Sequence, residues 1–304
     1  MKKKILLTFD YEPYLGAKSG TIERCLVEPT AALLDILSKY GAKAVFFIDT
    51  LYILSLKQNP ELEKEYIIAT NQIKELYKKG YYIFPHIHPH WVDAKYLPEI
   101  KQYDLSNLEK YSLASISNVE VEDLFQQSFS LLKELGISYK EWGYRAGGWC
   151  IQPFSKYTEI FRRHNIRFDF SVLPYYKNEK KEQYFDFSGS KNREPYRFND
   201  DVMVDDENGA FKEFPISSIS IDYKVKFFTR VVNKYLWEKN DKGWGNGTGA
   251  QTAALKSTQP SDEMISIDIL NIAKLDVYKN FLKENNYMHW ISHPKMFTRH
   301  GLRT

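Results

Sequence analysis

Three of the chain's seven histidines lie within five residues: His86, His88 and His90. Imidazole is the commonest protein ligand of metal ions, and a catalytic zinc site combines such rings with other ligands such as a carboxylate. In a strand, His86 and His88 would point to the same side, whereas in a helix His86 and His90 would share a face. The cluster therefore predicts a metal site; a solvated histidine-rich turn is the alternative.

An acidic pair, Asp10 and Glu12, follows the apolar run 5–9 (ILLTF). Side-chain alternation places both carboxylates on one side of an extended segment. One can serve as an oxygen ligand and the other as a general base, which a metal-dependent hydrolase needs. Such a pair can also be a simple turn or helix cap, so its significance depends on the histidine cluster.

Short apolar runs alternate with amphipathic stretches along most of the chain. This order predicts parallel strands with helices outside them. Residues 175–215 are expected to form an irregular insertion or β-hairpins. The predicted strands are 5–9, 44–48, 81–85, 141–145, 167–172 and 287–292, and the predicted helices are 28–40, 61–79, 120–135, 153–164, 224–238 and 268–285.

Polar residues gather at the carboxyl ends of these strands, where barrel enzymes place their active sites. The acidic pair follows the first strand and the histidine cluster the third. Arg145, Asp169 and His293 occupy the equivalent places on later strands. We therefore expect all these side chains to meet at one end of the sheet.

The chain resembles the polysaccharide deacetylases, the NodB-homology group of carbohydrate esterases (family 4). Their first motif, Thr-Phe-Asp-Asp-Gly, is similar to 8–12 (TFDYE), and their two histidines four apart are similar to His86 and His90. Further motifs of the family resemble, in family order, residues 44–48 (AVFFI), 145–149 (RAGGW), 169–171 (DFS) and 291–293 (ISH).

The resemblance implies a distorted (β/α) barrel forming a single domain over 1–304, and it implies roles for individual residues. Asp10 would be the general base on a metal-activated water, and His293 the general acid for the leaving amine. Arg145 would orient Asp10 by an ion pair, and Asp169 would support His293. The backbone N–H of Gly148 would help to hold the oxyanion.

The implied metal ligands are Glu12 with two of the three histidines. The aspartate that usually follows the base in this family is Tyr11 here, and a phenol with a pKa of about 10 is a poor zinc ligand. Some family members use the next residue, a place that Glu12 takes. His88 is an additional histidine, which either replaces His90 as a ligand or contacts the substrate. The expected metal is zinc, with cobalt or nickel as alternatives.

Two tryptophans and a glycine-rich stretch complete the candidate site. Trp91 and Trp149 directly follow site motifs and are expected either to line a sugar pocket or to pack in the core. Residues 243–249 (GWGNGTG) are expected to be a mobile loop, or to close over the phosphate of a linked sugar. The stretch lacks the lysine of a P-loop.

Composition excludes several other classes. With 42 basic and 39 acidic residues, the net charge of +3 gives no basis for nucleic-acid binding. Neither a secretory signal nor a run of 18 apolar residues is present. Cys25 and Cys150 form neither a disulfide framework nor a zinc spacing. These features predict a cytoplasmic protein.

The sequence thus predicts a metal-dependent hydrolase that removes an N-acetyl or other N-acyl group from a sugar. The expected substrate is a nucleotide- or lipid-linked cytoplasmic precursor of a surface polysaccharide. One alternative is hydrolysis of an imide, ureide or formamide on the same fold. The other is a non-catalytic carbohydrate-binding barrel that has lost its metal.

Overall fold

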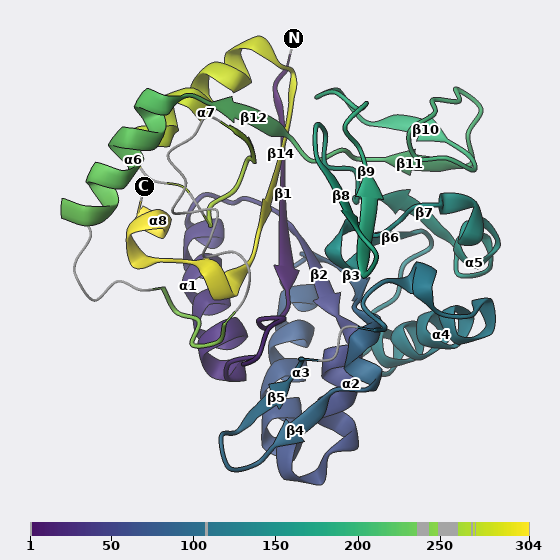
Figure 1. Ribbon diagram of the computed structural model, residues 1–304. Coiled ribbons are helices and arrows are strands. Elements are labelled where there is room, and N and C mark those ends of the chain that lie inside the picture. Colours follow the sequence, from purple (N-terminus) through teal and green to yellow (C-terminus); the bar gives the residue numbers. More distant parts are fainter. Residues whose placement is uncertain are drawn as a thin grey trace.

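An open eight-stranded sheet forms the centre of the protein (Figure 1). The computed structural model describes residues 2–106, 109–235, 243–248, 261–268, 270 and 272–303. The strand order is β10-β11-β7-β6-β3-β2-β1-β14. In chain order these strands are β1 (Lys4–Tyr11), β2 (Val45–Asp49), β3 (Tyr82–Ile87), β6 (Trp142–Ala146), β7 (Ile166–Asp169), β10 (Tyr196–Phe198), β11 (Phe211–Glu213) and β14 (Tyr287–Ser292).

Seven of these strands run parallel, and only β10 pairs antiparallel, with β11. All six predicted strands are present, which confirms the expected α/β class. The sheet curls, with β10 and β14 as its edges, so the predicted distorted barrel takes an open form. Part of the 175–215 insertion supplies β10 and β11 and thereby widens the sheet.

Helices cover the sheet, and shorter elements decorate it (Figure 1). A π-helix at Glu23–Val27 precedes α1. The small two-stranded sheets are β4 (Lys95–Leu97) with β5 (Gln102–Asp104), β8 (Lys177–Lys180) with β9 (Gln183–Asp186), and β12 (Ser218–Ile221) with β13 (Ser261–Met264). The α-helices are α1 (Glu28–Lys39), α2 (Thr50–Gln58), α3 (Glu63–Lys78), α4 (Asn118–Glu134), α5 (Thr158–Arg163), α6 (Tyr223–Tyr235), α7 (Ile272–Glu284) and α8 (Arg299–Arg303).

The predicted helices all have a counterpart, although their ends differ. A capping box of Ser117 and Glu120 begins α4, and Gly136 follows this helix with a φ of 81°. The predicted helix 224–238 corresponds to α6, but residues 236–238 lie outside the described residues, as does Gly249 of the glycine-rich stretch. None of the described helices has the length and apolar composition to span a bilayer.

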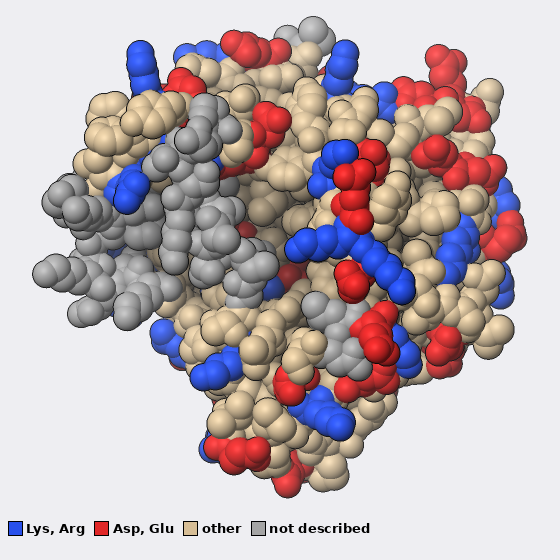
Figure 2. Space-filling model, viewed as in Figure 1, with Lys and Arg blue, Asp and Glu red and all other residues tan. Residues whose placement is uncertain are grey.

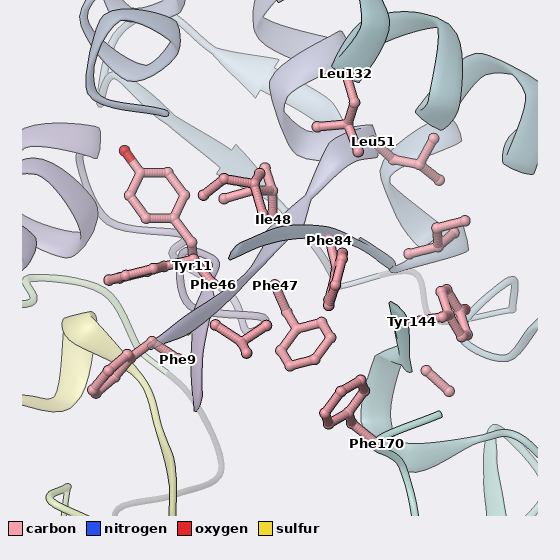
Figure 3. Close-up of a cluster of buried hydrophobic side chains, with 14 of the residues drawn as sticks. Phe9, Tyr11, Phe46, Phe47, Ile48, Leu51, Phe84, Leu132, Tyr144 and Phe170 are labelled. Carbon is pink, nitrogen blue, oxygen red and sulfur yellow. The ribbon is translucent and has the colours of Figure 1, made fainter. Parts of the chain in front are cut away.

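Aromatic side chains from the central strands fill the core (Figure 3). Phe46 on β2 is fully buried, and its ring centroid lies 5.2 Å from that of Phe9 and 5.7 Å from that of Tyr81. Such rings remove a large apolar area from water and interlock at close packing. They fix the strands whose carboxyl ends carry the polar residues of the candidate site.

Replacing Phe46 with Ala is expected to lower the free energy of unfolding by about 3–5 kcal/mol, because a buried ring is lost and a cavity remains. Urea unfolding would measure the loss. Tyr40→Ala is the control: its side chain is 72% exposed, so its change should stay within about 0.5 kcal/mol. A loss below about 1 kcal/mol for Phe46→Ala would contradict this packing.

Candidate active site

The carboxyl ends of four strands bring the candidate residues together. Asp10 lies on β1, with Glu12 just beyond it; His86 lies on β3, Arg145 on β6, and His293 follows β14. All five side chains are buried. They surround or underlie a cavity of about 370 Å³, lined by Asp10, Glu12, Tyr14, Leu15, His86, His88, Tyr111, Ala146, Gly148, Trp149, Tyr176, Lys177, Asn178, Gln183, Phe185, His293 and Lys295.

One carboxylate oxygen and two imidazole nitrogens converge at the base of this cavity. Glu12 Oε2 lies 2.7 Å from His88 Nε2 and 3.1 Å from His86 Nε2. The two Nε2 atoms are 3.0 Å apart. A tetrahedral zinc ion with bonds of about 2.0–2.1 Å places its ligand atoms about 3.3 Å apart. The three atoms therefore have nearly the separation that such an ion requires.

The hydrogen bonds around His86 support a cation at this point. Its Nδ1 lies 2.8 Å from the carbonyl oxygen of Arg145, which can only accept, so Nδ1 carries a proton. In the neutral ring, Nε2 then directs a lone pair at the Glu12 carboxylate, itself an acceptor. Two acceptors buried in contact are unfavourable unless a cation or a proton lies between them. A divalent metal satisfies both, so the donor set fits the metal that the sequence predicts.

Lys295, which the sequence did not reveal, holds the other oxygen of Glu12. Its buried Nζ donates to Glu12 Oε1 and to the carbonyl of Pro13, both at 2.7 Å. Burial alone would raise the pKa of Glu12, but the charges of Lys295 and His88 outweigh it and hold the pKa well below its usual range. Glu12 is thus a carboxylate with one oxygen, Oε2, directed at the histidines.

Tyr11, which occupies the place of the usual metal-binding aspartate, faces away from these atoms. It is fully buried, and its hydroxyl donates to Gln72 Oε1 at 2.9 Å. Burial raises the pKa of this phenol further above its ordinary value. Its position agrees with the expectation that Glu12 takes over the ligand role.

His90 lies outside the group formed by Glu12, His86 and His88. Its ring stacks on that of Tyr111, with centroids 5.6 Å apart, and neither ring nitrogen has a hydrogen-bond partner in the described part of the chain. The backbone stays extended through His88, and a 3₁₀ turn, Pro89–Val92, begins only after it. Alternation therefore favours the pair His86 and His88 as ligands, and the identity of the ligands stays a prediction.

One carboxylate oxygen of Asp10 faces the cavity, and the other faces Arg145. Arg145 Nη1 donates to Asp10 Oδ1 at 2.5 Å. Asp10 Oδ2 lies 4.0 Å from His86 Nε2 and 3.6 Å from His293 Nε2. The free oxygen is thus next to both the metal-ligand group and the imidazole expected to act as the acid.

Arg145 is fully buried and held on every side. Its Nη2 donates to Thr8 Oγ1 at 2.8 Å and lies 3.1 Å from His289 Nε2. The Nδ1 of His289 faces the carbonyl of Phe214 at 3.0 Å, so Nδ1 is the donor and Nε2 accepts from Arg145. His289, which sequence reasoning missed, therefore fixes the guanidinium that orients Asp10.

The partner of His293 is Asp268, whereas the sequence predicted Asp169. His293 Nδ1 lies 2.7 Å from Asp268 Oδ2, and the His293 backbone N–H donates to Asp268 Oδ1 at 2.8 Å. Asp169 instead accepts from the backbone and hydroxyl of Ser171. The reason is topological: Asp169 ends β7, five positions from β14 in the sheet, while the segment that carries Asp268 lies beside β14, where the Ile267 backbone N–H donates to Ser292 Oγ.

The cavity wall combines predicted and unpredicted residues. Gly148 and Trp149 line it, and the β8–β9 hairpin closes over them, with Gln183 donating to the Gly148 carbonyl at 3.1 Å. Over this hairpin Figure 2 shows basic side chains interspersed with Asp and Glu. Trp91 lies instead in the core, where its indole N–H donates to Asp49 Oδ2. That placement favours packing over contact with a sugar.

The described part of the glycine-rich stretch, 243–248, is anchored beside the site. Trp244 and Gly245 donate backbone hydrogen bonds to the segment around Lys295, and Thr248 pairs with Lys18. At Gly245 a Cβ atom would come within 2.4 Å of the Lys295 carbonyl and 2.5 Å of the Tyr14 ring. The glycine permits this close approach, and the mobile loop that the sequence suggested stays a prediction.

Comparison with family models agrees with this geometry. The first 141 residues match the polysaccharide deacetylase family. The predicted resemblance is confirmed for this part of the chain, which includes Asp10, Glu12 and the three histidines. The similarities at 145–149, 169–171 and 291–293 lie beyond the matched residues and stay predictions.

Three solved structures illustrate the similarity. The polysaccharide deacetylase Bc1974 from Bacillus cereus is 19% identical, with a TM-score of 0.32, over 57% of this chain and 62% of that one. A family 4 acetyl xylan esterase from Clostridium thermocellum, in complex with a cobalt ion, is 17% identical, with a TM-score of 0.31, over 57% and 59%. A mutant of a CE4 family pseudoenzyme with restored enzymatic activity is 14% identical, with a TM-score of 0.36, over 57% and 46%.

The chain thus spans less than two thirds of each of these proteins. None of the curated proteins compared with the chain matches it.

Proposed function

We propose that the chain is a metal-dependent hydrolase that removes an N-acetyl or other N-acyl group from a sugar, with residues 1–304 forming one domain. The observation that carries the proposal is the position of the Glu12, His86 and His88 donor atoms at the base of the cavity, beside Asp10 Oδ2 and His293 Nε2. The family match of residues 1–141 supports the deacetylase class.

Glu12, His86 and His88 would hold a divalent ion, zinc in the first place and cobalt or nickel as alternatives. Such an ion lowers the pKa of a water molecule to about 7 and polarises an acyl oxygen. Asp10 supplies the general base: Arg145 occupies its Oδ1, so Oδ2 is the oxygen that takes a proton from the attacking water. The ion pair orients the carboxylate.

His293 supplies the general acid. Its Nδ1 is held by Asp268, so Nε2 is the atom that faces the cavity and delivers a proton to the leaving amine. Burial alone would lower the pKa of His293, but the carboxylates of Asp268 and Asp10 outweigh it and raise the pKa. A raised pKa favours the protonated ring that the departure of an amine needs.

Aromatic rings around the cavity support a sugar as the substrate. Tyr14, Tyr111 and Trp149 line it together with the polar side chains of Asn178 and Gln183. Flat apolar faces beside a few hydrogen-bonding groups are the combination that binds sugar rings. The cytoplasmic location and the surface-polysaccharide precursor stay predictions of the sequence.

Metal reconstitution with activity profiling tests the proposal. The chain is loaded with zinc, cobalt or nickel and incubated with N-acetylated chitooligosaccharides, cyclic imides and formamides. We expect acetate release that a chelator abolishes and added metal restores. Opening of an imide without acetate release would assign the alternative C–N hydrolase. Sugar binding that a chelator does not change, with no hydrolysis, would assign the binding barrel.

A further inference from the structure

Helix α6 turns three aromatic side chains outward. Tyr223, Phe227 and Phe228 are 57%, 48% and 60% exposed, although Phe is usually among the buried residue types. The ring of Phe227 lies 6.4 Å from that of Tyr223 and 6.2 Å from that of Phe228, so the three rings form one continuous apolar surface. Figure 1 places this helix with α7 beside the β14 edge of the sheet.

The opposite face of α6 buries a lysine. Lys226 is 6% exposed, and its Nζ lies 2.5 Å from Glu263 Oε1 and 2.8 Å from Ser261 Oγ. Glu263 Oε2 pairs with the buried Lys274 of α7 at 2.5 Å. Rotating the helix to bury its rings would break this buried pair, which is strongly unfavourable. The outward direction of the aromatic surface is therefore fixed by the fold.

The exposed surface of α6 is also basic. Lys224 and Arg230 are exposed beside the three rings, and in the described part of the chain neither forms an ion pair with a carboxylate. Asp222, just before the helix, is engaged in capping, because its Oδ1 accepts from the Val225 backbone N–H. Figure 2 shows tan side chains with blue ones beside them over α6, at the upper left.

We propose that this α6 surface (Tyr223, Lys224, Phe227, Phe228 and Arg230) docks onto a membrane surface that carries anionic headgroups. Helices that lie in the membrane interface combine aromatic rings, which enter the boundary between headgroups and acyl chains, with Lys and Arg that meet anionic lipids. The α6 surface has both parts on one face. Docking of this kind is peripheral.

Charge complementarity selects the membrane over a second copy of the chain. In a two-fold dimer through α6, the same surface would face itself, and Lys224 and Arg230 of one copy would approach the same cations of the other. An anionic bilayer neutralises them instead. The inference does not depend on the proposed hydrolase activity, because α6 carries none of the residues that line the active-site cavity.

Co-sedimentation of the full chain with vesicles tests the proposal. Vesicles of phosphatidylcholine with an equal share of phosphatidylglycerol are compared with vesicles of phosphatidylcholine alone. We expect the chain to bind the anionic vesicles and to dissociate as salt rises, because each cation near such a surface contributes about fivefold in binding. Absence of binding to anionic vesicles at low salt would overturn the proposal.

Two double variants separate the contributions of rings and charges. Phe227→Ser with Phe228→Ser should lower binding at least about tenfold. Lys224→Gln with Arg230→Gln should lower it about 20–30-fold and remove most of the salt dependence. The control is Tyr40→Ser with Val119→Ser, two side chains 72% and 80% exposed elsewhere, which should bind as the parent protein does.

Two further readouts keep the test decisive. The thermal unfolding midpoint should be the same for all variants, since every substituted side chain is exposed. If the ring variant unfolds, vesicle binding by the charge variant alone tests the proposal. Size-exclusion chromatography should give the same elution volume for parent and ring variant. A dimer that the ring variant disperses, together with equal binding to both kinds of vesicle, would assign the surface to a second copy of the chain.

Discussion

Replacing Asp10 with Asn is expected to lower the rate of acetate release by about 10²–10⁴-fold, the usual contribution of a general base, while metal content stays unchanged. Arg145 Nη1 donates to Oδ1 at 2.5 Å, so the amide oxygen of Asn should take this position. The amide NH₂ then replaces Oδ2 and cannot accept a proton. The substitution preserves shape and removes the basic oxygen together with the negative charge that faces Arg145 and His293.

The measurement pairs initial rates with metal analysis of the same sample. Asp276→Asn is the matched control, because this carboxylate on α7 is exposed and far from the cavity lining. It should change neither rate nor metal content. A rate for Asp10→Asn equal to that of the parent would exclude Asp10 as the base. A proportional loss of metal and rate would instead identify Asp10 as a ligand.

The sequence predicts a site residue where the residues next to it in the chain identify it, and it does not predict contacts between residues that are far apart in the chain. Asp10, Glu12 and the histidines could be found because each follows a recognisable apolar strand, and parallel strands bring their carboxyl ends to one edge. Their chemistry is inherent in residue type and spacing. The alternation of strands and helices was then enough to predict a parallel sheet, and the apolar pattern of most segments shows this alternation.

The unpredicted partners arise from pairings that span nearly the whole chain. Lys295 contacts Glu12 across 283 positions, and His289 meets Arg145 across 144. A lysine two residues after a histidine has no local signature of an ion pair with a distant carboxylate. Asp268 likewise becomes the partner of His293 only because the segment between β13 and α7 lies beside β14, where the Ile291 backbone N–H donates to the Ile265 carbonyl.

Helix α2 was not predicted from the sequence, for a different reason. Residues 50–58 (TLYILSLKQ) carry apolar side chains on nearly all sides, because the helix is buried between α3, α4 and β3. A helix without a polar face lacks the periodicity that reveals amphipathic helices such as α1. The difference between a buried helix and a loop then lies in tertiary packing.

Removing the His88 ring is expected to weaken metal binding more than about 100-fold, whereas removing the His90 ring should change it only a few-fold. Loss of even an outer-shell partner costs about 10–100-fold in metal affinity, so loss of a direct ligand should exceed that range. His88 Nε2 lies 2.7 Å from Glu12 Oε2, while His90 stacks on Tyr111 outside the group of donor atoms. His88→Ala and His90→Ala are therefore a matched pair in one segment.

Metal affinity of the two variants, measured by competition with a chromophoric chelator, decides between two spacings of the ligands. The extended backbone through His88 favours ligands two residues apart, His86 and His88. The family motif has them four residues apart, as His86 and His90 are. Thermal unfolding of the metal-free variants shows whether either ring matters for packing alone. If His90→Ala loses the metal and His88→Ala keeps it, the turn after His88 must rearrange on binding. In that case His88, rather than His90, is the histidine left to contact the substrate.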